Sequence, residues 1–242
     1  MTSNYWDKES GFYDRQWHNS PVSEFAYTCT KDVLFSFLDP SMNDKMLEIG
    51  CGLGTWTEIV GSKCRAITAV DISKEMIRKA KKNVSLKNAK LIVSDFLSFK
   101  TNERFDKIFA VRSFEYLDDT EAGLRKVWEM LKPRGKFVII TKSKPCAWEF
   151  VYYERWKRSG FRQNKASCIK MRKLLSSVGF VNIKMLPVIM RLPVFRGGNM
   201  EIPLIPNPAA KYLLALGIIL RKFQPLILFA ESYAACATRG ES

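Results

Sequence analysis

The 242-residue sequence lacks several patterns that mark well-known protein classes. It has one histidine, and its six cysteines include no C-x-x-C pair and are too scattered for a disulfide scaffold or a zinc ribbon. The segment MTSNYWDKESGFYDRQW has no basic stretch followed by an apolar run, so we expect no secretory signal. The longest apolar run, Tyr212 to Leu220, falls short of the roughly 20 residues that a spanning helix requires. These absences predict a cytoplasmic protein with reduced thiols, no metal site and no membrane span.

Positive charge is abundant and unevenly placed. The net charge is +15, and residues 141–242 hold 17 Lys and Arg against 5 Asp and Glu, a balance of +12. Residues 1–40 are acidic, with a balance of −3. The basic part predicts either an anionic partner or a plain solubility surface.

Short apolar runs alternate with amphipathic helical segments from residue 45 onward, which is typical of a parallel sheet wrapped by helices. Strands are expected at residues 45–50, 65–71, 89–95, 105–111, 136–141, 180–189 and 231–238. Ser73 and Asp119 are expected to cap the helices that follow them, and Gly179 to end another. Pro133 and Gly135 are expected to form the turn into the fifth strand. The pattern predicts one α/β domain.

The segment MLEIGCGLGTWTE, residues 46–58, places three alternating glycines between a predicted strand and a predicted helix. Glycines permit tight turns, and the free N–H groups at a helix start can face a ligand, so a nucleotide-type site is expected. The dinucleotide pattern G-x-G-x-x-G would need its third glycine at Thr55, but the sequence has Gly54, and no Gly-Lys-Ser/Thr follows to make a P-loop. Glu48 would repel a pyrophosphate and attract an ammonium or sulfonium group, which favours a cationic ligand without phosphate.

Two further carboxylates follow predicted strands. Asp71 can accept hydrogen bonds from both hydroxyls of a ribose, and Asp95 could accept from the amine of an adenine, beside the backbone N–H and ring of Phe96. Open parallel sheets bind ligands at the carboxyl ends of their strands, so the ordered set predicts a nucleoside site. An N-cap role for either aspartate, and simple turn chemistry for the glycines, are the alternatives.

These motifs resemble class I S-adenosylmethionine-dependent methyltransferases of the small-molecule type, similar to the methyltransferase-11 group that includes ubiquinone and menaquinone methyltransferases. The resemblance is carried, in family order and spacing, by LEIGCGLGTWT, AVDIS, VSDF, FDKIFAVRSFEYLDD and LKPRGKFVIIT. It implies an α/β, doubly wound, Rossmann-like sheet of seven strands in the order 3-2-1-4-5-7-6, with the last strand antiparallel. One methyltransferase domain is expected over residues 1–242, comprising an N-terminal lid (1–40), a cofactor-binding core (41–141), the rest of the fold (142–189 and 229–242) and an insertion between strands six and seven (190–228).

The resemblance also implies S-adenosyl-L-methionine as the cofactor. The glycine loop would line its methionine part, Asp71 would hold the ribose, Asp95 and Phe96 the adenine, and the residues after strand four would close the site. The expected cofactor-binding residues are Glu48, Gly50, Cys51, Gly52, Gly54, Asp71, Ile72, Asp95, Phe96, Arg112 and Ser113.

The catalytic residues are less defined by the sequence. Many relatives have Glu-His after strand four where this chain has Glu115-Tyr116, which removes one candidate imidazole. Glu115, Tyr116 and His18 are therefore the candidate catalytic residues, with an exposed or capping role as the alternative for His18. Another departure is Arg134, in a turn where glycine is usual.

Residues 190–228 bear on the methyl acceptor. A helix expected from about Lys211 to Phe223 has a continuous apolar stripe and basic flanks, as in interfacial membrane elements. A helix packed over the active site, or a dimer contact, is the alternative. We expect a small lipophilic acceptor, such as a quinone, an isoprenoid or a lipid, and a protein peripheral to the membrane.

Two other functions stay open on the sequence. An RNA methyltransferase could use the basic C-terminal third to contact phosphates. The loop RSFEYLDD differs from the Asn-Pro-Pro-Tyr type of many base-amine methyltransferases, so nucleic acid is not the expected partner. A non-catalytic, methyltransferase-like binding protein is the second alternative.

Overall fold

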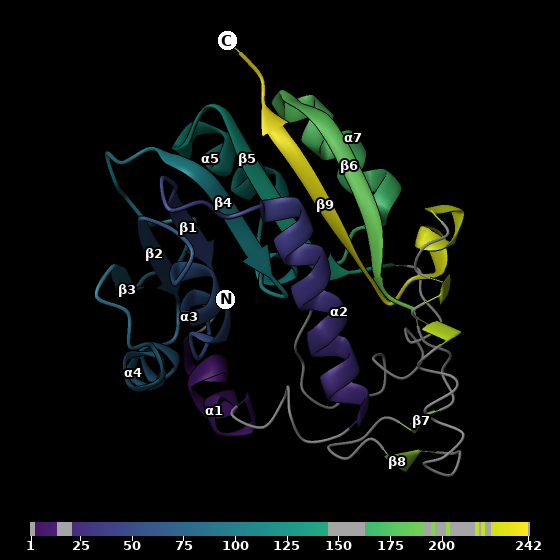
Figure 1. Ribbon diagram of the computed structural model, residues 1–242, viewed down its shortest axis with the longest axis horizontal. Coiled ribbons are helices and arrows are strands. Elements are labelled where there is room, and N and C mark those ends of the chain that lie inside the picture. The colour runs from purple at the N-terminus through teal and green to yellow at the C-terminus, as the bar shows by residue number, and fades with distance from the viewer. Residues whose placement is uncertain are drawn as a thin grey trace.

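A computed structural model describes residues 3–13, 21–144, 163–190, 195–196, 202–203, 216–217, 219–220 and 224–241. These residues build a central sheet with helices on both faces (Figure 1). The sheet consists of β1 (Lys45–Ile49), β2 (Ala66–Asp71), β3 (Ala89–Val93), β4 (Phe105–Val111), β5 (Leu131–Lys142), β6 (Phe180–Ile189) and β9 (Ser232–Arg239).

The strand order is β3-β2-β1-β4-β5-β9-β6. β1 to β5 are parallel, and β9 runs antiparallel to both β5 and β6. The predicted sheet, with its order and its antiparallel last strand, is confirmed. The order reverses at β1, whose neighbours are β2 and β4, and a reversal of this kind opens a crevice at the carboxyl ends of the strands.

The helices cover the two faces of the sheet. One face carries α2 (Pro21–Leu38), α3 (Thr55–Gly61) and α4 (Lys74–Asn83), and α1 (Ser3–Tyr13) packs on α4. The other face carries α5 (Thr120–Met130) and α7 (Cys168–Val178). The short helix η1 (Phe114–Tyr116) follows β4, and η2 (Gln224–Phe229) precedes β9.

Alternation along the central strands distributes the core between these two faces. On β4, Phe109 and Val111 pack toward α2 and α3, while Ile108 and Ala110 pack toward α5 and α7. Buried side chains on both faces explain why these strands read as continuous apolar runs in the sequence.

Local signals in the sequence set the helix ends. The Ser73 Oγ accepts a hydrogen bond from the Met76 N–H, and the Asp119 carboxylate accepts one from the Ala122 N–H, so both residues are N-caps as predicted. α7 ends at Gly179, whose φ of +104° lies in the left-handed region that glycine adopts readily.

The structure corrects one expectation: residues 131–135 were expected to form a turn between α5 and the fifth strand, but they belong to β5. β5 begins directly after α5, at Leu131, which pairs with Phe105 before an irregularity brings Lys136 opposite Lys107. The segment with Pro133 therefore stays in the strand as a bulge, because a bulge tolerates the missing N–H of proline. Arg134 takes a φ of +62°, which is the reason that a glycine suits this position.

Residues 190–228 are described in part. Two short strands, β7 (Phe195–Arg196) and β8 (Ile202–Pro203), pair with each other and were not expected. Within the expected helix, residues 216–217 and 219–220 are helical. A Cβ on Gly217 would lie 2.2 Å from the Met190 carbonyl oxygen and 3.3 Å from Phe25 Cζ, so this glycine packs against α2 and the end of β6. The helix expected around Trp148, Tyr152 and Trp156 lies outside the described residues.

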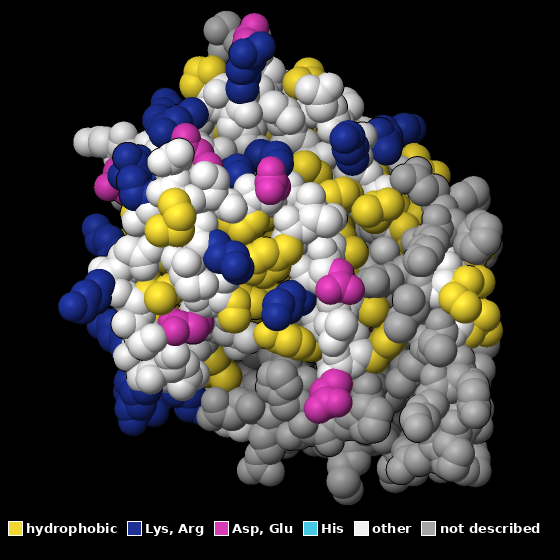
Figure 2. Space-filling view, in the orientation of Figure 1, with side chains coloured by type: hydrophobic (Ala, Val, Ile, Leu, Met, Phe, Trp, Pro, Cys, Tyr) yellow, Lys and Arg dark blue, Asp and Glu magenta, His cyan; other side chains and the backbone are white. Residues whose placement is uncertain are grey.

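Two properties of the surface bear on partners. Lys and Arg side chains gather along the α4 edge of the face shown in Figure 2, where Lys81 and Lys82 end the helix. A search of the described part of the chain finds no helix long and apolar enough to span a membrane.

Candidate cofactor and acceptor site

The glycine loop between β1 and α3 is held in a left-handed conformation at alternate residues. Gly50, Gly52 and Gly54 have φ values of +70°, +53° and +83°. A residue with a Cβ is strained in this region, so the backbone path alone requires the three glycines. The glycines at alternate positions of the sequence therefore correspond to left-handed residues at alternate positions of the backbone.

The three glycines differ in what surrounds them. A Cβ on Gly50 would lie 2.3 Å from Ser113 Cβ, and one on Gly54 would lie 2.5 Å from Cγ2 of Val84, the C-cap residue of α4. A Cβ on Gly52 would meet no atom within 4 Å. Gly50 and Gly54 thus allow the loop to pack on β4 and α4, whereas Gly52 borders open space.

Asp71, at the end of β2, fixes the loop from the neighbouring strand. One carboxylate oxygen accepts a hydrogen bond from the Gly52 N–H at 2.8 Å, and the other accepts from the Ser73 N–H at 2.9 Å. Burial raises the pKa of Asp71, and these backbone donors oppose the shift. Each oxygen keeps a lone pair, so the carboxylate can still accept hydrogen bonds from a diol. The N-cap alternative does not apply to Asp71, since Ser73 caps α4.

Asp95 and Phe96 follow β3 at the far end of the site. The Asp95 carboxylate accepts a hydrogen bond from the Leu97 N–H at 2.7 Å, which bends the chain into a tight turn. Phe96 is buried beneath this turn, and Lys126 of α5 lies 5.5 Å from the centre of its ring. The turn thus brings one polar side chain, Asp95, and one apolar side chain, Phe96, to the same end of the site.

The segment after β4 closes the site opposite Asp71. The Ser113 hydroxyl donates to the Ile49 carbonyl and so joins the end of β4 to the start of the glycine loop. Tyr116 of η1 accepts a hydrogen bond from Gln163 Nε2 at 2.7 Å and makes an edge-to-face contact with Trp6 of α1, with ring centres 4.7 Å apart. The glycine loop, the segment after β4 and α1 thereby enclose one cavity.

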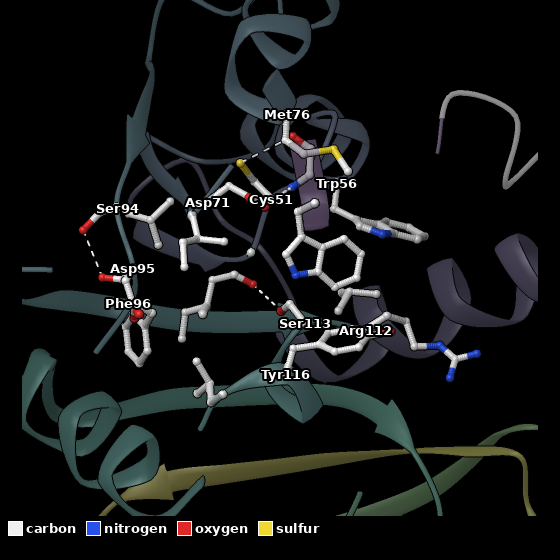
Figure 3. A pocket seen from close by; sticks show the side chains of 18 of the residues that line it. Cys51, Trp56, Asp71, Met76, Ser94, Asp95, Phe96, Arg112, Ser113 and Tyr116 are labelled. Atoms are coloured by element: carbon white, nitrogen blue, oxygen red, sulfur yellow. Dashed lines mark hydrogen bonds between the residues drawn. The ribbon is translucent and has the colours of Figure 1, made fainter. Parts of the chain in front are cut away.

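That space is a cavity of about 1050 Å³, including the part that opens to solvent. Figure 3 shows Asp95 and Phe96 on one side of it and Trp56 and Arg112 on the other. Its lining includes nine of the predicted cofactor-binding residues: Gly50, Cys51, Gly52, Asp71, Ile72, Asp95, Phe96, Arg112 and Ser113.

Glu48 and Gly54, also expected to line the ligand, are not part of the cavity lining: Gly54 of the loop packs on α4, and Glu48 lies behind the loop. Glu48 is 1% exposed, and its Oε2 accepts a hydrogen bond from the Thr57 hydroxyl at 2.5 Å. Burial raises the pKa of Glu48 to about 8, so the carboxyl group is protonated at neutral pH. Glu48 therefore lies under α3, outside the cavity lining, where its protonated side chain carries no charge.

The cavity also has a cysteine in its wall. Burial, together with the nearby Glu48 and Asp71, raises the pKa of the Cys51 thiol. Cys51 therefore stays protonated, which makes it a packing residue and no nucleophile.

The three candidate catalytic residues are placed differently. Tyr116 lines the cavity. Glu115 is 2% exposed and turned away from it, with its Oε2 accepting a hydrogen bond from the Thr141 hydroxyl at 2.9 Å. His18 lies outside the described residues.

Sequence reasoning missed several residues of the cavity wall. Trp6 comes from α1, and its neighbour Asp7 accepts a hydrogen bond from the Ser73 hydroxyl at 2.5 Å. No pattern in the N-terminal segment marks Trp6, because its contact joins residues far apart in the chain. The other wall residues outside the predicted set are Ile49, Leu53, Thr55, Trp56, Val70, Met76, Ser94, Leu97, Val111 and Leu117, whereas Asp118, a polar group that the sequence suggested near the site, does line the cavity.

The fold and the cavity together define a class of protein. A sheet in the order 3-2-1-4-5-7-6, with a glycine loop after its first strand and acidic residues ending the next two, is the arrangement of class I S-adenosylmethionine-dependent methyltransferases.

Comparison with known proteins agrees with this class. Residues 46–135 match the family model described as a methyltransferase domain. A malonyl-[acyl-carrier protein] O-methyltransferase of Priestia megaterium is 35% identical over 98 residues, which are 40% of this chain and 36% of that protein. A 23S rRNA (uracil(1939)-C(5))-methyltransferase of Vibrio vulnificus is 32% identical over 119 residues, 46% of this chain and 26% of that protein. The similarity thus spans well under half of these relatives.

A solved structure extends the likeness to nearly the whole chain. It comes from Thermotoga maritima and is described as a "SAM-dependent methyltransferase, possible histamine N-methyltransferase". Its TM-score is 0.70 at 17% identity, covering 98% of this chain and 100% of that one, so it supports the fold. Residues 46–135 of the present chain accordingly match a methyltransferase domain, which agrees with the family resemblance, and the solved structure supports the fold.

Proposed function

We propose that the protein transfers a methyl group from S-adenosyl-L-methionine to a small, lipophilic acceptor such as a quinone, an isoprenoid or a lipid. The use of S-adenosyl-L-methionine is supported by the cavity at the carboxyl ends of β1 to β4. Its wall combines a glycine loop, the Asp71 carboxylate and the Asp95–Phe96 turn in the order that a nucleoside with a charged tail requires.

The residues of the cavity fit this cofactor. Asp71 has lone pairs for the two ribose hydroxyls, and Asp95 and Phe96 offer an acceptor and an apolar surface for a purine. Gly52 leaves open space where a larger residue would place its side chain. The Asp71 carboxylate beside the loop favours a positive charge.

The chemistry needs little from the protein beyond positioning. When bound, the cofactor supplies a methyl group already activated by its sulfonium. The chain orients the acceptor in line with that methyl at about 3 Å and excludes water. Trp6, Trp56 and Tyr116 provide apolar walls for this purpose. If the acceptor is a hydroxyl, the Tyr116 oxygen is a candidate to take up or relay its proton.

The lipophilic acceptor is supported by the described part of residues 190–228. Leu216 is 42% exposed and Ile219 55%, and both lie on the predicted apolar stripe. The neighbouring Gly217 is buried against α2. The described residues of this segment therefore include one packed position, Gly217, and two apolar side chains exposed to solvent, as expected for an interfacial helix.

Two alternatives follow from particular observations. A relative acts on 23S rRNA, and the C-terminal third has a balance of +12, which together favour RNA as the second candidate substrate. A binding protein without activity would keep the cavity and lack turnover.

The first test is cofactor binding by calorimetry. We expect S-adenosyl-L-homocysteine to bind with micromolar or better affinity. Asp71→Asn should weaken binding at least tenfold, because an amide cannot replace a carboxylate that accepts hydrogen bonds through both oxygens. Glu75→Gln, on the exposed side of α4, is the matched control. A wild-type protein that fails to bind would refute the proposal.

The second test identifies the acceptor. The protein is incubated with methyl-labelled cofactor and separated lipid, RNA and small-molecule fractions of a cell extract, and the labelled product is identified by mass. Label in the lipid fraction is expected. Label in RNA selects the first alternative, and binding without any labelled product selects the second.

A further inference from the structure

A second group of polar side chains lies beside the cavity, at the carboxyl ends of β4 and β5 and the start of β9. It comprises Arg112, Glu115, Lys142, Glu231 and Ser232, which are brought together by strand pairing. Lys142 pairs with Ser232, the Arg112 N–H donates to the Ile140 carbonyl, and the Ser143 N–H donates to that of Glu231. In the strand order, β4, β5 and β9 lie on the opposite side of β1 from β3, which Asp95 follows.

Three side-chain atoms of this group are buried without a hydrogen-bond partner. They are Arg112 Nη1, Glu115 Oε1 and Ser232 Oγ. Among the described residues, the only other such atom is Arg239 Nε. A buried polar atom without a partner is costly, and its occurrence at the ligand-binding edge of a parallel sheet indicates a partner supplied from outside the chain.

Arg112 links this group to the cavity. It lines the cavity wall, and its side chain is 15% exposed. Its φ of +56° is strained for a residue with a Cβ, and such strain is found where a side chain is aimed for a function. Figure 3 shows its guanidinium pointing away from the Asp95 side of the cavity. Its ion pair with Glu231 is long, at 3.8 Å, so the guanidinium keeps donors for a ligand.

The charge of the group favours a single negative charge on that ligand. Burial, and then the nearby Arg112, lower the pKa of Lys142 to about 7, while Glu115 and Glu231 oppose the shift and Lys165 adds to it. A bound anion would favour the protonated form of Lys142. A monoanion costs less to bury here than a dianion, because each buried charge must be desolvated.

We propose that Arg112 binds a carboxylate on the methyl acceptor, so that the acceptor is an acid with an apolar body. This inference rests on the proposed function and narrows its acceptor class. The Arg112 Nη1 donates to a carboxylate oxygen, and the apolar body lies against Trp56 and the rest of the apolar wall.

The test is calorimetric titration with octanoate, in the presence of saturating S-adenosyl-L-homocysteine. Octanol and octyl phosphate serve as uncharged and dianionic probes of the same length. Octanoate is expected to bind saturably and at least tenfold more tightly than octanol. Arg112→Gln should remove that difference, and Arg125→Gln, an exposed arginine of α5, should leave it unchanged. No saturable octanoate binding, octanoate bound no better than octanol, tighter octyl phosphate, or no effect of Arg112→Gln would overturn the inference.

A second variant, which is expected to tighten octanoate binding, excludes misfolding as the explanation of a loss of binding. Glu231→Gln removes the carboxylate that competes for Arg112 and should tighten octanoate binding several-fold, which unfolding cannot mimic. Octanoate binding should also take up a proton at pH 8, measured by titration in HEPES and in Tris, because a bound anion favours the protonated Lys142. Weaker binding to Glu231→Gln, or no proton uptake, would count against the role of this group.

The two levels of the proposal fail separately. If S-adenosyl-L-homocysteine does not bind the wild-type protein, the proposed function is wrong. If the wild-type protein binds S-adenosyl-L-homocysteine but binds octanoate no better than octanol, only the carboxylate inference is wrong.

Discussion

At the scale of single residues, the glycine loop separates two roles that the sequence merges. Gly50 is required by the packing of Ser113, while Gly52 borders the cavity and meets nothing. Both need a left-handed backbone. The same substitution at the two positions should therefore have different effects on stability and on binding.

We expect Gly52→Ala to cost about 1 to 2 kcal/mol of unfolding free energy, for the backbone strain alone. Gly50→Ala should cost about 2 to 5 kcal/mol, because the clash with Ser113 adds to the strain. Urea unfolding measures both values. Gly52→Ala should nonetheless weaken S-adenosyl-L-homocysteine binding, since its methyl group enters the cavity. Equal losses of stability at the two positions would contradict this account.

The buried Glu48 makes a prediction about pH. Its pKa is about 8 in the folded protein against an ordinary value of 4.5, so the folded state holds more protons than the unfolded state between these limits. Its stabilising contribution is complete below pH 4.5 and is lost as the pH rises through 8. From pH 5 to pH 8, the wild type should lose at most about 4 kcal/mol of unfolding free energy relative to Glu48→Gln.

Thermal or urea unfolding at several pH values measures this difference. Glu75→Gln, an exposed glutamate of α4, is the control and should follow the wild type. If the curves of wild type and Glu48→Gln run parallel across this window, Glu48 does not hold a proton in the folded state.

At the scale of elements, we propose that α1, which contributes Trp6 to the cavity wall, covers the bound ligand. It packs on α4, its Trp6 contacts Tyr116 at the cavity wall, and Asp7 accepts a hydrogen bond from the N-cap residue Ser73. Lys79 of α4 donates to the Ser10 carbonyl at 2.7 Å. These contacts tie the cover to the helix that follows Asp71.

Trp6→Ala should weaken S-adenosyl-L-homocysteine binding by about five- to tenfold, since burial of one large side chain contributes about 1 to 3 kcal/mol and part of that surface faces the cavity. The change should appear mainly as faster dissociation, measured by stopped-flow fluorescence. Lys8→Ala on the exposed side of α1 is the control. Unchanged dissociation in Trp6→Ala would show that α1 does not cover the bound ligand.

At the scale of the whole molecule, charge and exposed apolar surface coincide in the C-terminal third. The balance of +12 would attract anionic lipids, and the exposed Ile219 would insert between them. Salt should weaken the attraction, because the Debye length falls from about 10 Å at 0.1 M to about 3 Å at 1 M.

Sedimentation with anionic vesicles should recover the protein at low salt and release most of it at 1 M salt. Ile219→Asp should reduce binding about tenfold. Ile169→Asp is the matched control, because Ile169 on α7 is equally exposed, at 54% against 55%. Binding that ignores Ile219, or no binding to anionic vesicles at low salt, would remove the support for a membrane-borne acceptor.

From the sequence alone, the seven strands of the central sheet, the caps of α4 and α5, and nine residues that line the cavity could be predicted. Each of these depends on local chemistry: the alternation of Ile108 and Phe109, the Ser73 hydroxyl, the left-handed glycines. Only the tertiary structure decided that Glu48 lies behind the loop, that Glu115 turns toward Thr141, and that Arg112 keeps an unpaired donor. Those outcomes depend on contacts between segments distant in the chain, for which a local pattern carries no signal.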